Sequence, residues 1–230
     1  VVLQVQRGGH AAEFLVQPAR SGTRWCLGAQ VRDHISGIGT VTFYDPADGT
    51  FGALGHGVSG FTDARLLQIA SGSLIGASVA DVRRGAAGAP GELHGTFDPG
   101  KTLGSVTANT RCGLFGTAAE LPQRTALPVA AQEQVHTGAA TILANVQGEA
   151  VEEFSIRIEK LYPGAQNGRD LLLRIDDETL LEQTGGIVQG MSGSPILQDG
   201  RIVGAVTHVL VSDPERGYGI LIENMLEAAA

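Results

Sequence analysis

Apolar and polar residues alternate with a period of two over several stretches of the chain. In residues 151–161, Phe154, Ile156 and Ile158 fall on one face, and the positions between them are polar. This alternation is typical of an antiparallel strand with one buried face. The apolar run at 139–146 ends at a turn over 147–149, so the two stretches together predict a hairpin.

Turn-forming residues separate further short apolar runs. Residues 45–49 read Asp-Pro-Ala-Asp-Gly, in which Pro presets φ and Gly tolerates a positive φ. Asp199-Gly200 forms a second turn of this kind. Strands are predicted at 1–6, 13–17, 40–44, 50–54, 171–175, 194–198, 201–207 and 218–222, with short apolar runs among glycines at 66–82 and 103–107. One helical turn is expected at 178–183 and a short helix at 223–228. Many short strands with turns between them are typical of an all-β sandwich or barrel.

A change of composition divides the chain near residue 22. Residues 1–17 form a self-contained hairpin that ends at Pro18, and residues 19–23 are small and polar. We therefore expect a linker at 19–23, with a short N-terminal part before it and one large β domain after it.

Composition excludes several classes of protein. Apolar residues make up 43% of the 230 positions and charged residues 17%, which is unlike a disordered chain. The 33 glycines have no three-residue period, so collagen is excluded. A net charge of −8 disfavours binding to nucleic acid phosphates. No apolar stretch approaches the length of a membrane span. The chain starts at Val1 without Met or a signal-peptide pattern, so we expect it to be a fragment of a longer protein.

Cys26 and Cys112 are the two cysteines of the chain. The simplest interpretation is two buried thiols, and a disulfide is the alternative, because sequence does not show whether their Cα atoms approach within about 7 Å. Without a Cys-x-x-Cys or His-x-x-x-His spacing, no metal site is expected, and no other cofactor is indicated.

The sharpest candidate for chemistry is the hexapeptide at 190–195, Gly-Met-Ser-Gly-Ser-Pro. A nucleophilic serine needs an exposed hydroxyl, a sharp backbone turn and N–H groups aimed at the oxyanion. Glycines around Ser192 allow such a turn, and the N–H groups of Gly190 and Ser192 are the natural oxyanion donors. The alternative is an ordinary Gly/Ser-rich loop. The lipase elbow Gly-x-Ser-x-Gly does not fit, because position 194 is Ser.

Ser192 needs a general base, and His56 is the strongest candidate. It lies between Gly55 and Gly57 at the end of a hairpin strand, where an imidazole can be exposed. A structural role is the alternative for His56, and His208, on the strand after the serine hairpin, is the second candidate for the base. The other histidines are His10, His34, His94 and His136. The residues leave open which carboxylate orients the base: Asp45, Asp63, Asp176, Asp177 or Asp213.

Two long stretches resemble a known family. One is residues 37–46, Gly-Ile-Gly-Thr-Val-Thr-Phe-Tyr-Asp-Pro, continuing to Leu-Gly-His-Gly at 54–57. The other is residues 184–195, Thr-Gly-Gly-Ile-Val-Gln-Gly-Met-Ser-Gly-Ser-Pro, continuing through 205–209 to Gly-Tyr-Gly-Ile at 217–220. They resemble the peptidase domain of the stage IV sporulation protein B family of endospore-forming bacteria, over roughly residues 24–230. Residues 1–18 look like the closing strands of the PDZ domain that precedes the peptidase in that family.

The resemblance implies an all-β, chymotrypsin-like double β-barrel at 23–230, after a C-terminal remnant of a PDZ-like domain plus linker at 1–22. It implies a serine endopeptidase with His56, Asp177 and Ser192 as the catalytic residues. Its partners would be protein substrates, namely itself and a regulatory membrane protein whose cleavage leads to sigma-factor maturation. The place of action would be outside the mother-cell cytoplasm, between the membranes around the forespore.

One position departs from trypsin-like enzymes, which carry Asp immediately before the serine to pair with a freed N-terminus. Here that position is Met191. We therefore predict that activity does not depend on a new N-terminus inserting beside Ser192. Two other functions stay open: a catalytically idle peptidase-fold module that acts in protein–protein binding, and an esterase that uses the same nucleophile.

Overall fold

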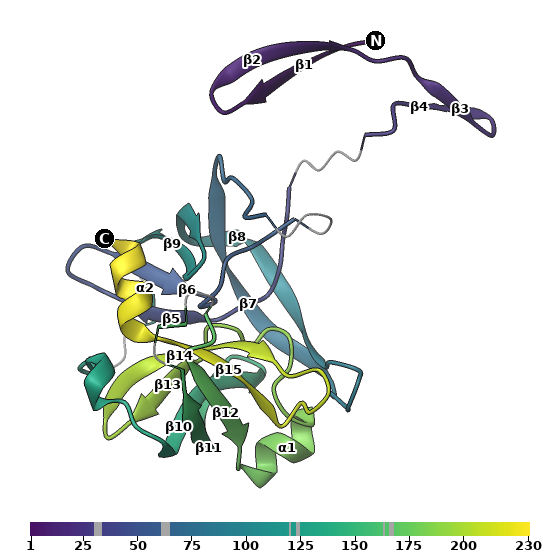
Figure 1. The fold of residues 1–230 in the computed structure, drawn as a ribbon. Coiled ribbons are helices and arrows are strands. Elements are labelled where there is room, and N and C mark those ends of the chain that lie inside the picture. Colours follow the sequence, from purple (N-terminus) through teal and green to yellow (C-terminus); the bar gives the residue numbers. More distant parts are fainter. Residues whose placement is uncertain (30–33, 61–64, 120, 123–124, 163, 166–167) are drawn as a thin grey trace. The chain divides into compact units, whose positions relative to one another are not determined.

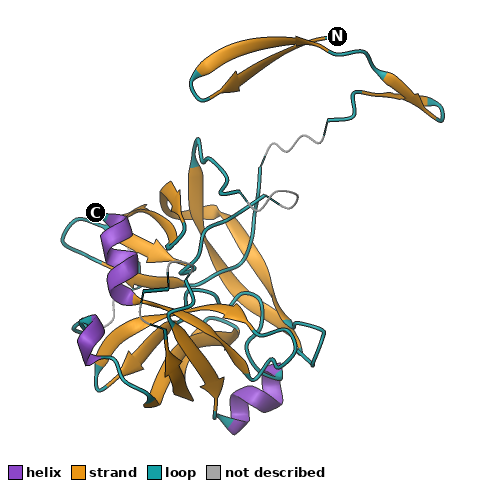
Figure 2. Ribbon diagram, viewed as in Figure 1, coloured by secondary structure: helices purple, strands orange, loops and turns teal. Residues whose placement is uncertain are grey.

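The structure, a computed structural model, describes residues 1–29, 34–60, 65–119, 121–122, 125–162, 164–165 and 168–230. The chain divides into two compact units, Val1–Ser36 and Gly37–Ala230 (Figure 1). Strands make up most of the described structure, and the helices are short (Figure 2). The described part of the chain contains no helix long and apolar enough to cross a lipid bilayer.

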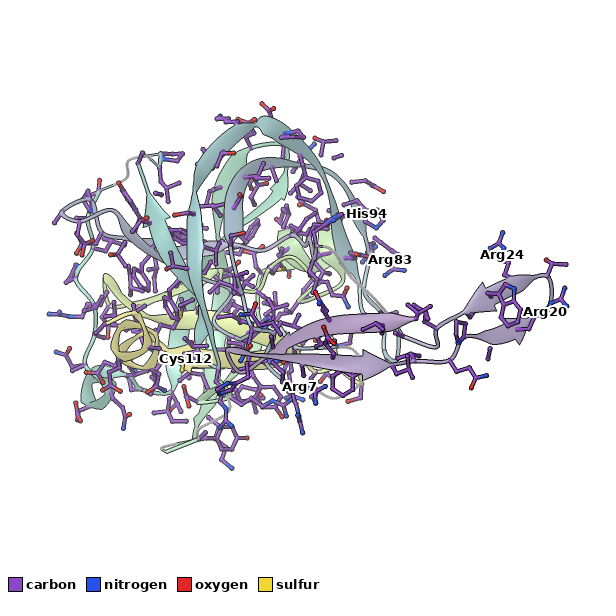
Figure 3. All side chains as sticks on the ribbon, turned by 90° about the horizontal axis from the view of Figure 1, so that it is seen from above. Arg7, Arg20, Arg24, Arg83, His94 and Cys112 are labelled. Carbon is purple, nitrogen blue, oxygen red and sulfur yellow. The ribbon has the colours of Figure 1, made fainter. Side chains whose placement is uncertain are left out.

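The first unit consists of two hairpins. Strands β1 (Val2–Arg7) and β2 (His10–Leu15) pair as predicted, around glycines of positive φ at the turn. Residues 19–23, expected to be a linker, instead contribute β3 (Ala19–Ser21), which pairs with β4 (Arg24–Cys26). The exposed side chains of Arg20 and Arg24 lie on this second hairpin (Figure 3). Cys26 is free and exposed, so the expectation of two buried thiols was wrong for this residue; Cys112 is free and half-buried.

The second unit begins with an open five-stranded sheet in the order β5-β6-β9-β8-β7. Its strands are β5 (Val41–Tyr44), β6 (Thr50–Ala53), β7 (Gly72–Arg83), β8 (Glu92–Thr110) and β9 (Gly113–Ala118). The hairpin of β5 and β6 confirms the turn predicted at 45–49. Strands β7 and β8 are far longer than the short runs expected there. Arg83 and His94 lie close together near one end of this pair, where both contact Glu92 (Figure 3).

The rest of the chain forms a closed six-stranded barrel in the order β10-β11-β12-β15-β14-β13. Its strands are β10 (Gly138–Gln147), β11 (Ala150–Leu161), β12 (Leu171–Ile175), β13 (Pro195–Gln198), β14 (Arg201–Val209) and β15 (Arg216–Leu221). A 3-10 helix, η1 (Gln132–Gln134), precedes β10, and α1 (Glu178–Thr184) follows β12. The alternation predicted for β11 is confirmed, because Phe154, Ile156 and Ile158 are buried and their polar neighbours are exposed. Each such buried side chain contributes on the order of 2 kcal/mol to stability.

The barrel and the open sheet share a small apolar cluster. It joins Phe115 of β9, Ala205 of β14, Ile220 of β15 and Met225 of helix α2 (Ile222–Ala229). The all-β fold class is confirmed: a closed barrel and an open half-barrel make up the double β-barrel that the resemblance implied.

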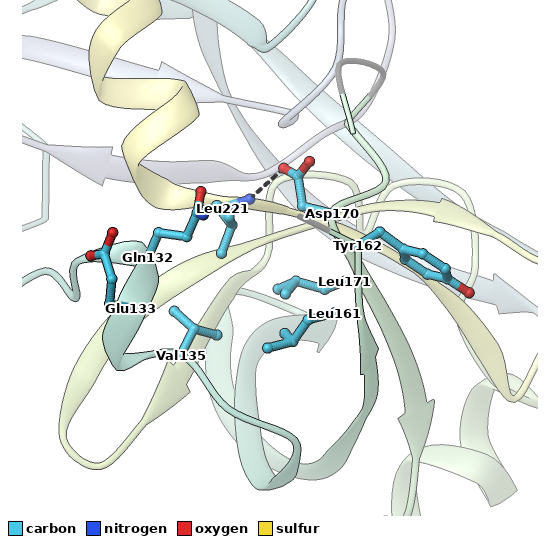
Figure 4. A pocket seen from close by; sticks show the side chains of 8 residues that line it. All are labelled: Gln132, Glu133, Val135, Leu161, Tyr162, Asp170, Leu171 and Leu221. Atoms are coloured by element: carbon cyan, nitrogen blue, oxygen red, sulfur yellow. Dashed lines mark hydrogen bonds between the residues drawn. The ribbon is translucent and has the colours of Figure 1, made fainter. Parts of the chain in front are cut away.

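A buried carboxylate fixes the start of α2 to the barrel. Asp170, just before β12, accepts hydrogen bonds from the backbone N–H of Leu221 (2.9 Å) and the side-chain amide of Asn224 (2.8 Å). It lies at the edge of a pocket that Gln132, Val135 and Tyr162 also line (Figure 4). Burial raises the pKa of the Asp170 carboxyl above its ordinary value, and the two hydrogen bonds act in the opposite direction.

Candidate active site

The loop that carries Ser192 has the sharp backbone turn that the sequence predicted. Gly190 and Gly193 have φ values of +103° and +94°, which L side chains rarely adopt. A Cβ at Gly193 would also collide with the carbonyl oxygen of Thr40. Met191 has no exposed surface and packs in the barrel core. The loop is therefore anchored by Met191, while Ser192 beside it stays only partly buried.

The peptide planes around Ser192 are held in fixed orientations. The carbonyl of Gln189 accepts from the N–H of Leu93 (2.8 Å), and the carbonyl of Met191 accepts from the N–H of Ser194 (2.9 Å). In a trans peptide the N–H points away from the carbonyl, so these bonds also set the directions of the Gly190 and Ser192 N–H groups. Within the described residues, neither N–H donates to a protein acceptor. Both N–H groups are available to an oxyanion.

The open sheet, together with Thr40 just before it, also holds this loop through hydrogen bonds. The backbone N–H of Thr40 donates to the carbonyl of Ser192 (2.9 Å), and its hydroxyl donates to the carbonyl of Gly190 (3.3 Å). The hydroxyl of Thr42 donates to the carbonyl of Gly193 (2.8 Å). Sequence reasoning missed both threonines, because Thr is common in strands and alternation alone assigned them to a hairpin.

His56 follows β6 through two residues in the left-handed region. Leu54 has φ +69° and Gly55 φ +67°, and a left-handed leucine costs of order 1 kcal/mol or more. A Cβ at Gly55 would lie 2.9 Å from the Thr207 side chain and 3.0 Å from that of Ile220. Glycine at this position therefore lets the chain run close against the barrel just before His56.

The imidazole of His56 makes one described hydrogen bond, between Nδ1 and the carbonyl oxygen of Gly57 (3.1 Å). A carbonyl can only accept, so this contact assigns the proton to Nδ1 and leaves Nε2 as a proton acceptor. That is the tautomer a general base needs.

Strand β14 contacts both Ser192 and His56. The hydroxyl of Ser192 donates to the carbonyl of Thr207 (2.9 Å), and the ring of His56 lies 5.0 Å, centroid to centroid, from that of His208. The two side chains thus contact adjacent residues of one strand. In this arrangement the Ser192 proton is directed at the carbonyl of Thr207 and not at the imidazole of His56.

Asp177 occupies the N-cap of α1. One carboxylate oxygen accepts from the N–H of Leu180 (3.0 Å) and the other from the N–H of Ser155 (3.2 Å). Among the described residues, no hydrogen bond joins Asp177 to His56.

The other candidate carboxylates are engaged elsewhere. Asp176 pairs with Arg157 (3.1 Å), Asp213 pairs with Arg216 (3.1 Å), and Asp45 accepts from a backbone N–H in its own turn. Asp63 lies outside the described residues.

These elements define a class of protein. A six-stranded barrel and a half-barrel, with a glycine-bounded serine and two free N–H groups where they meet, are the build of a chymotrypsin-like serine peptidase. The family model described as SpoIVB peptidase S55 matches residues 23–226, and the chain belongs to this family.

Solved structures similar to the chain include two of Rv3671c, both in an inactive form. One is a serine-to-alanine mutant from M. tuberculosis H37Rv, with a TM-score of 0.42 and 19% identity over 58% of this chain and 68% of that chain. The other, titled a protease, has a TM-score of 0.39 and 20% identity over 57% of this chain and 70% of that chain. A comparison with curated proteins finds no significant match.

Proposed function

We propose that Ser192 is the nucleophile and His56 the general base of a serine endopeptidase, with the N–H groups of Gly190 and Ser192 as its oxyanion hole. The observation that carries this proposal is the pair of free, fixed N–H groups beside a serine hydroxyl. Fixed donors stabilise a developing oxyanion without reorganising during the reaction.

The steps follow from the chemistry of acyl transfer. Nε2 of His56 takes the Ser192 proton as Oγ attacks the scissile carbonyl, and the carbonyl oxygen becomes an oxyanion held by the two N–H groups. His56 then gives the proton to the leaving amine, which departs and leaves an acyl-enzyme. Water, deprotonated by His56, releases the acyl group and restores Ser192.

The unpaired edge of β14 beside Ser192 is an argument that the substrate is a peptide. Strand β13 pairs with β14 only as far as the Pro195–Ala205 pair, so 207–209 pair only with β15 among the described strands. An extended peptide can add to such an edge. It would compete for the Thr207 carbonyl and so release the Ser192 hydroxyl toward His56.

Family membership supports a finer proposal for the biological role. The substrates would be the protein itself and a regulatory membrane protein in sporulation signalling, whose cleavage leads to sigma-factor maturation. The reaction would take place outside the mother-cell cytoplasm, between the membranes around the forespore. In this proposal residues 1–22 are the end of a PDZ-like domain with its linker, and Asp177 is the third catalytic residue implied by the resemblance.

Cleavage of peptide bonds tests the proposal. The purified chain is incubated alone and with a mixed peptide library, beside Ser192→Ala and His56→Ala variants, and products are identified by mass spectrometry. We expect cleavage by the native chain only, with losses of several orders of magnitude in the variants. Hydrolysis of short esters without any peptide cleavage would instead support an esterase.

One observation favours a second candidate, a catalytically idle module that binds other proteins. The Ser192 hydroxyl is bonded to Thr207 and not to His56. A well-folded native chain that cleaves nothing, with or without a partner, would support this second function.

A further inference from the structure

His208 is a partly buried histidine that the steps above do not use. It lies on β14 directly after Thr207, opposite Tyr218 of β15. Its Nδ1 atom is buried and has no hydrogen-bond partner among the described residues. Its ring faces that of His56 at 5.0 Å between centroids, with a tilt of 39°.

The surroundings of His208 favour its neutral form. Burial first, and then the charges of His56 and Arg169, lower the pKa of His208 to about 4. Tyr218, across the strand pair, has the Arg169 guanidinium 5.1 Å from its ring. His208 is therefore uncharged over the range in which an imidazole base works.

His56 needs a contact that fixes its ring. Its one described hydrogen bond goes to the carbonyl of the next residue, and the carboxylate of Asp177 is bonded to two backbone N–H groups at α1. Within the described residues, the ring of His208 is the aromatic group in contact with His56. Tilted ring pairs at this separation attract each other, so turning either ring away would lose a favourable contact.

We propose that His208 is a positioning residue for His56, and that contact between the two rings holds the base toward Ser192. An uncharged ring at position 208 also places no second positive charge beside the imidazolium that forms on His56 during proton transfer. This inference rests on the proposed roles of Ser192 and His56. A second positive charge this close would disfavour the imidazolium that forms on His56.

The test is the second-order rate of labelling of Ser192 by a fluorophosphonate, measured from pH 4 to 9 on the full chain. We expect His208→Ala to slow labelling by about 100-fold, because a displaced base loses its near-attack geometry. His208→Phe keeps a flat ring and should recover most of that loss. His208→Lys places a cation beside the base and should move the acid limb of the profile to lower pH.

Matched controls distinguish a wrong assignment of the Ser192–His56 site from a wrong role for His208. His136→Ala removes a surface histidine that pairs with Asp199, and we expect it to label like the native chain. Thermal melting establishes that each variant is folded. If His56→Ala labels normally, the proposed site is wrong. If His56→Ala abolishes labelling but His208→Ala labels within twofold of the native rate and His208→Lys leaves the acid limb unmoved, the role of His208 is overturned and the site stands.

Discussion

At the scale of single residues, the site depends on glycines that place backbones in close contact. At Gly193 the missing side chain leaves room for the carbonyl of Thr40. At Gly55, the residue before His56, it leaves room for the side chain of Thr207. Met191 fills the barrel core at the position where trypsin-like enzymes keep an ionised Asp. Gly193 and Met191 thus fix the turn at Ser192 with an apolar side chain, and not a charged one, at position 191.

Asp177 caps helix α1 and is also proposed to act on His56, and measurements of stability and of activity distinguish these two roles. Because it caps α1, Asp177→Ala should lower the free energy of unfolding by about 1 kcal/mol, and Asp177→Asn, also a good cap, should restore most of it. Denaturant unfolding measures both variants.

Labelling of Ser192 in the same two variants then assigns the role. An Asn variant that is as stable as the native chain but orders of magnitude slower would mean that the carboxylate acts on His56. Recovery of both stability and labelling would mean that Asp177 acts through the helix cap alone. No recovery of stability by Asn would contradict the capping contact itself.

The sequence predicted the backbone turns at the candidate site better than the contacts between its side chains. Glycines on both sides of Ser192 and His56 indicated exposed, sharply turning positions, and the structure has positive φ values at Gly190, Gly193 and Gly55. Nothing in the pattern indicated that Leu54 would also be left-handed, since a branched side chain disfavours that region. The contact of His56 with His208 joins residues 152 positions apart (208 minus 56), which no local pattern can show.

At the scale of secondary structure, the open sheet holds the loop that carries Ser192, through the start of β8 and through Thr40, the residue before β5. Gly91 and Leu93, at the start of β8, exchange two backbone hydrogen bonds with Gln189, and Thr40 bonds the loop twice. The proposed oxyanion hole would therefore depend on the hydrogen bonds between the sheet and this loop, and not on the hexapeptide alone.

Thr40→Val tests this dependence. Valine keeps the shape of threonine but leaves the carbonyl of Gly190 without its hydroxyl donor. A lost hydrogen bond of this kind costs about 1 kcal/mol, so labelling of Ser192 should slow by roughly five- to tenfold. The matched control is Thr96→Val, whose hydroxyl contacts Ser78 on the exposed β7–β8 pair. Equal labelling rates for Thr40→Val and Thr96→Val would contradict the role of the Thr40 hydroxyl in holding the loop.

The contact of Asp170 with α2 predicts a pH-dependent stability. Its folded-state pKa is raised above the ordinary value of 3.8, so its contribution is fully present below that pH and is lost as pH rises through the folded value. Asp170→Asn keeps an acceptor for Leu221 without the charge. We expect the variant to gain stability relative to the native chain between pH 3 and 7 in denaturant unfolding. A difference that does not change with pH would contradict the raised pKa.

Strands were predicted from the sequence where one face of the strand is buried. Strands β10 to β15 have a strong apolar pattern, because they enclose the barrel core. Strands β7 and β8 were expected only as short runs, since almost none of their positions is buried and β8 contains Pro99 and several glycines. Pairing between the two strands, rather than burial, extends them.

At the scale of the whole molecule, the second unit contains all the proposed catalytic residues. The units divide after Ser36, the family model begins at residue 23, and the domain boundary predicted from composition is near 22. The resemblance to a PDZ domain concerns only the first unit.

Two truncations test where the peptidase begins. Removal of residues 1–22 should leave the labelling of Ser192 within about twofold, since the residues of the site and the threonines that hold its loop are retained. Removal of residues 1–40 should abolish labelling, because Thr40 bonds both Leu54 and the nucleophile loop. Strong loss in the first truncation would mean that the N-terminal hairpin supports the site.

The most direct test of the central claim is fluorophosphonate labelling of the native chain, with the modified residue mapped by peptide mass spectrometry and with His56→Ala as the comparison. We predict a single modification at Ser192 that is lost when His56 is replaced. A folded native chain that stays unlabelled, or a label on another residue, would contradict it.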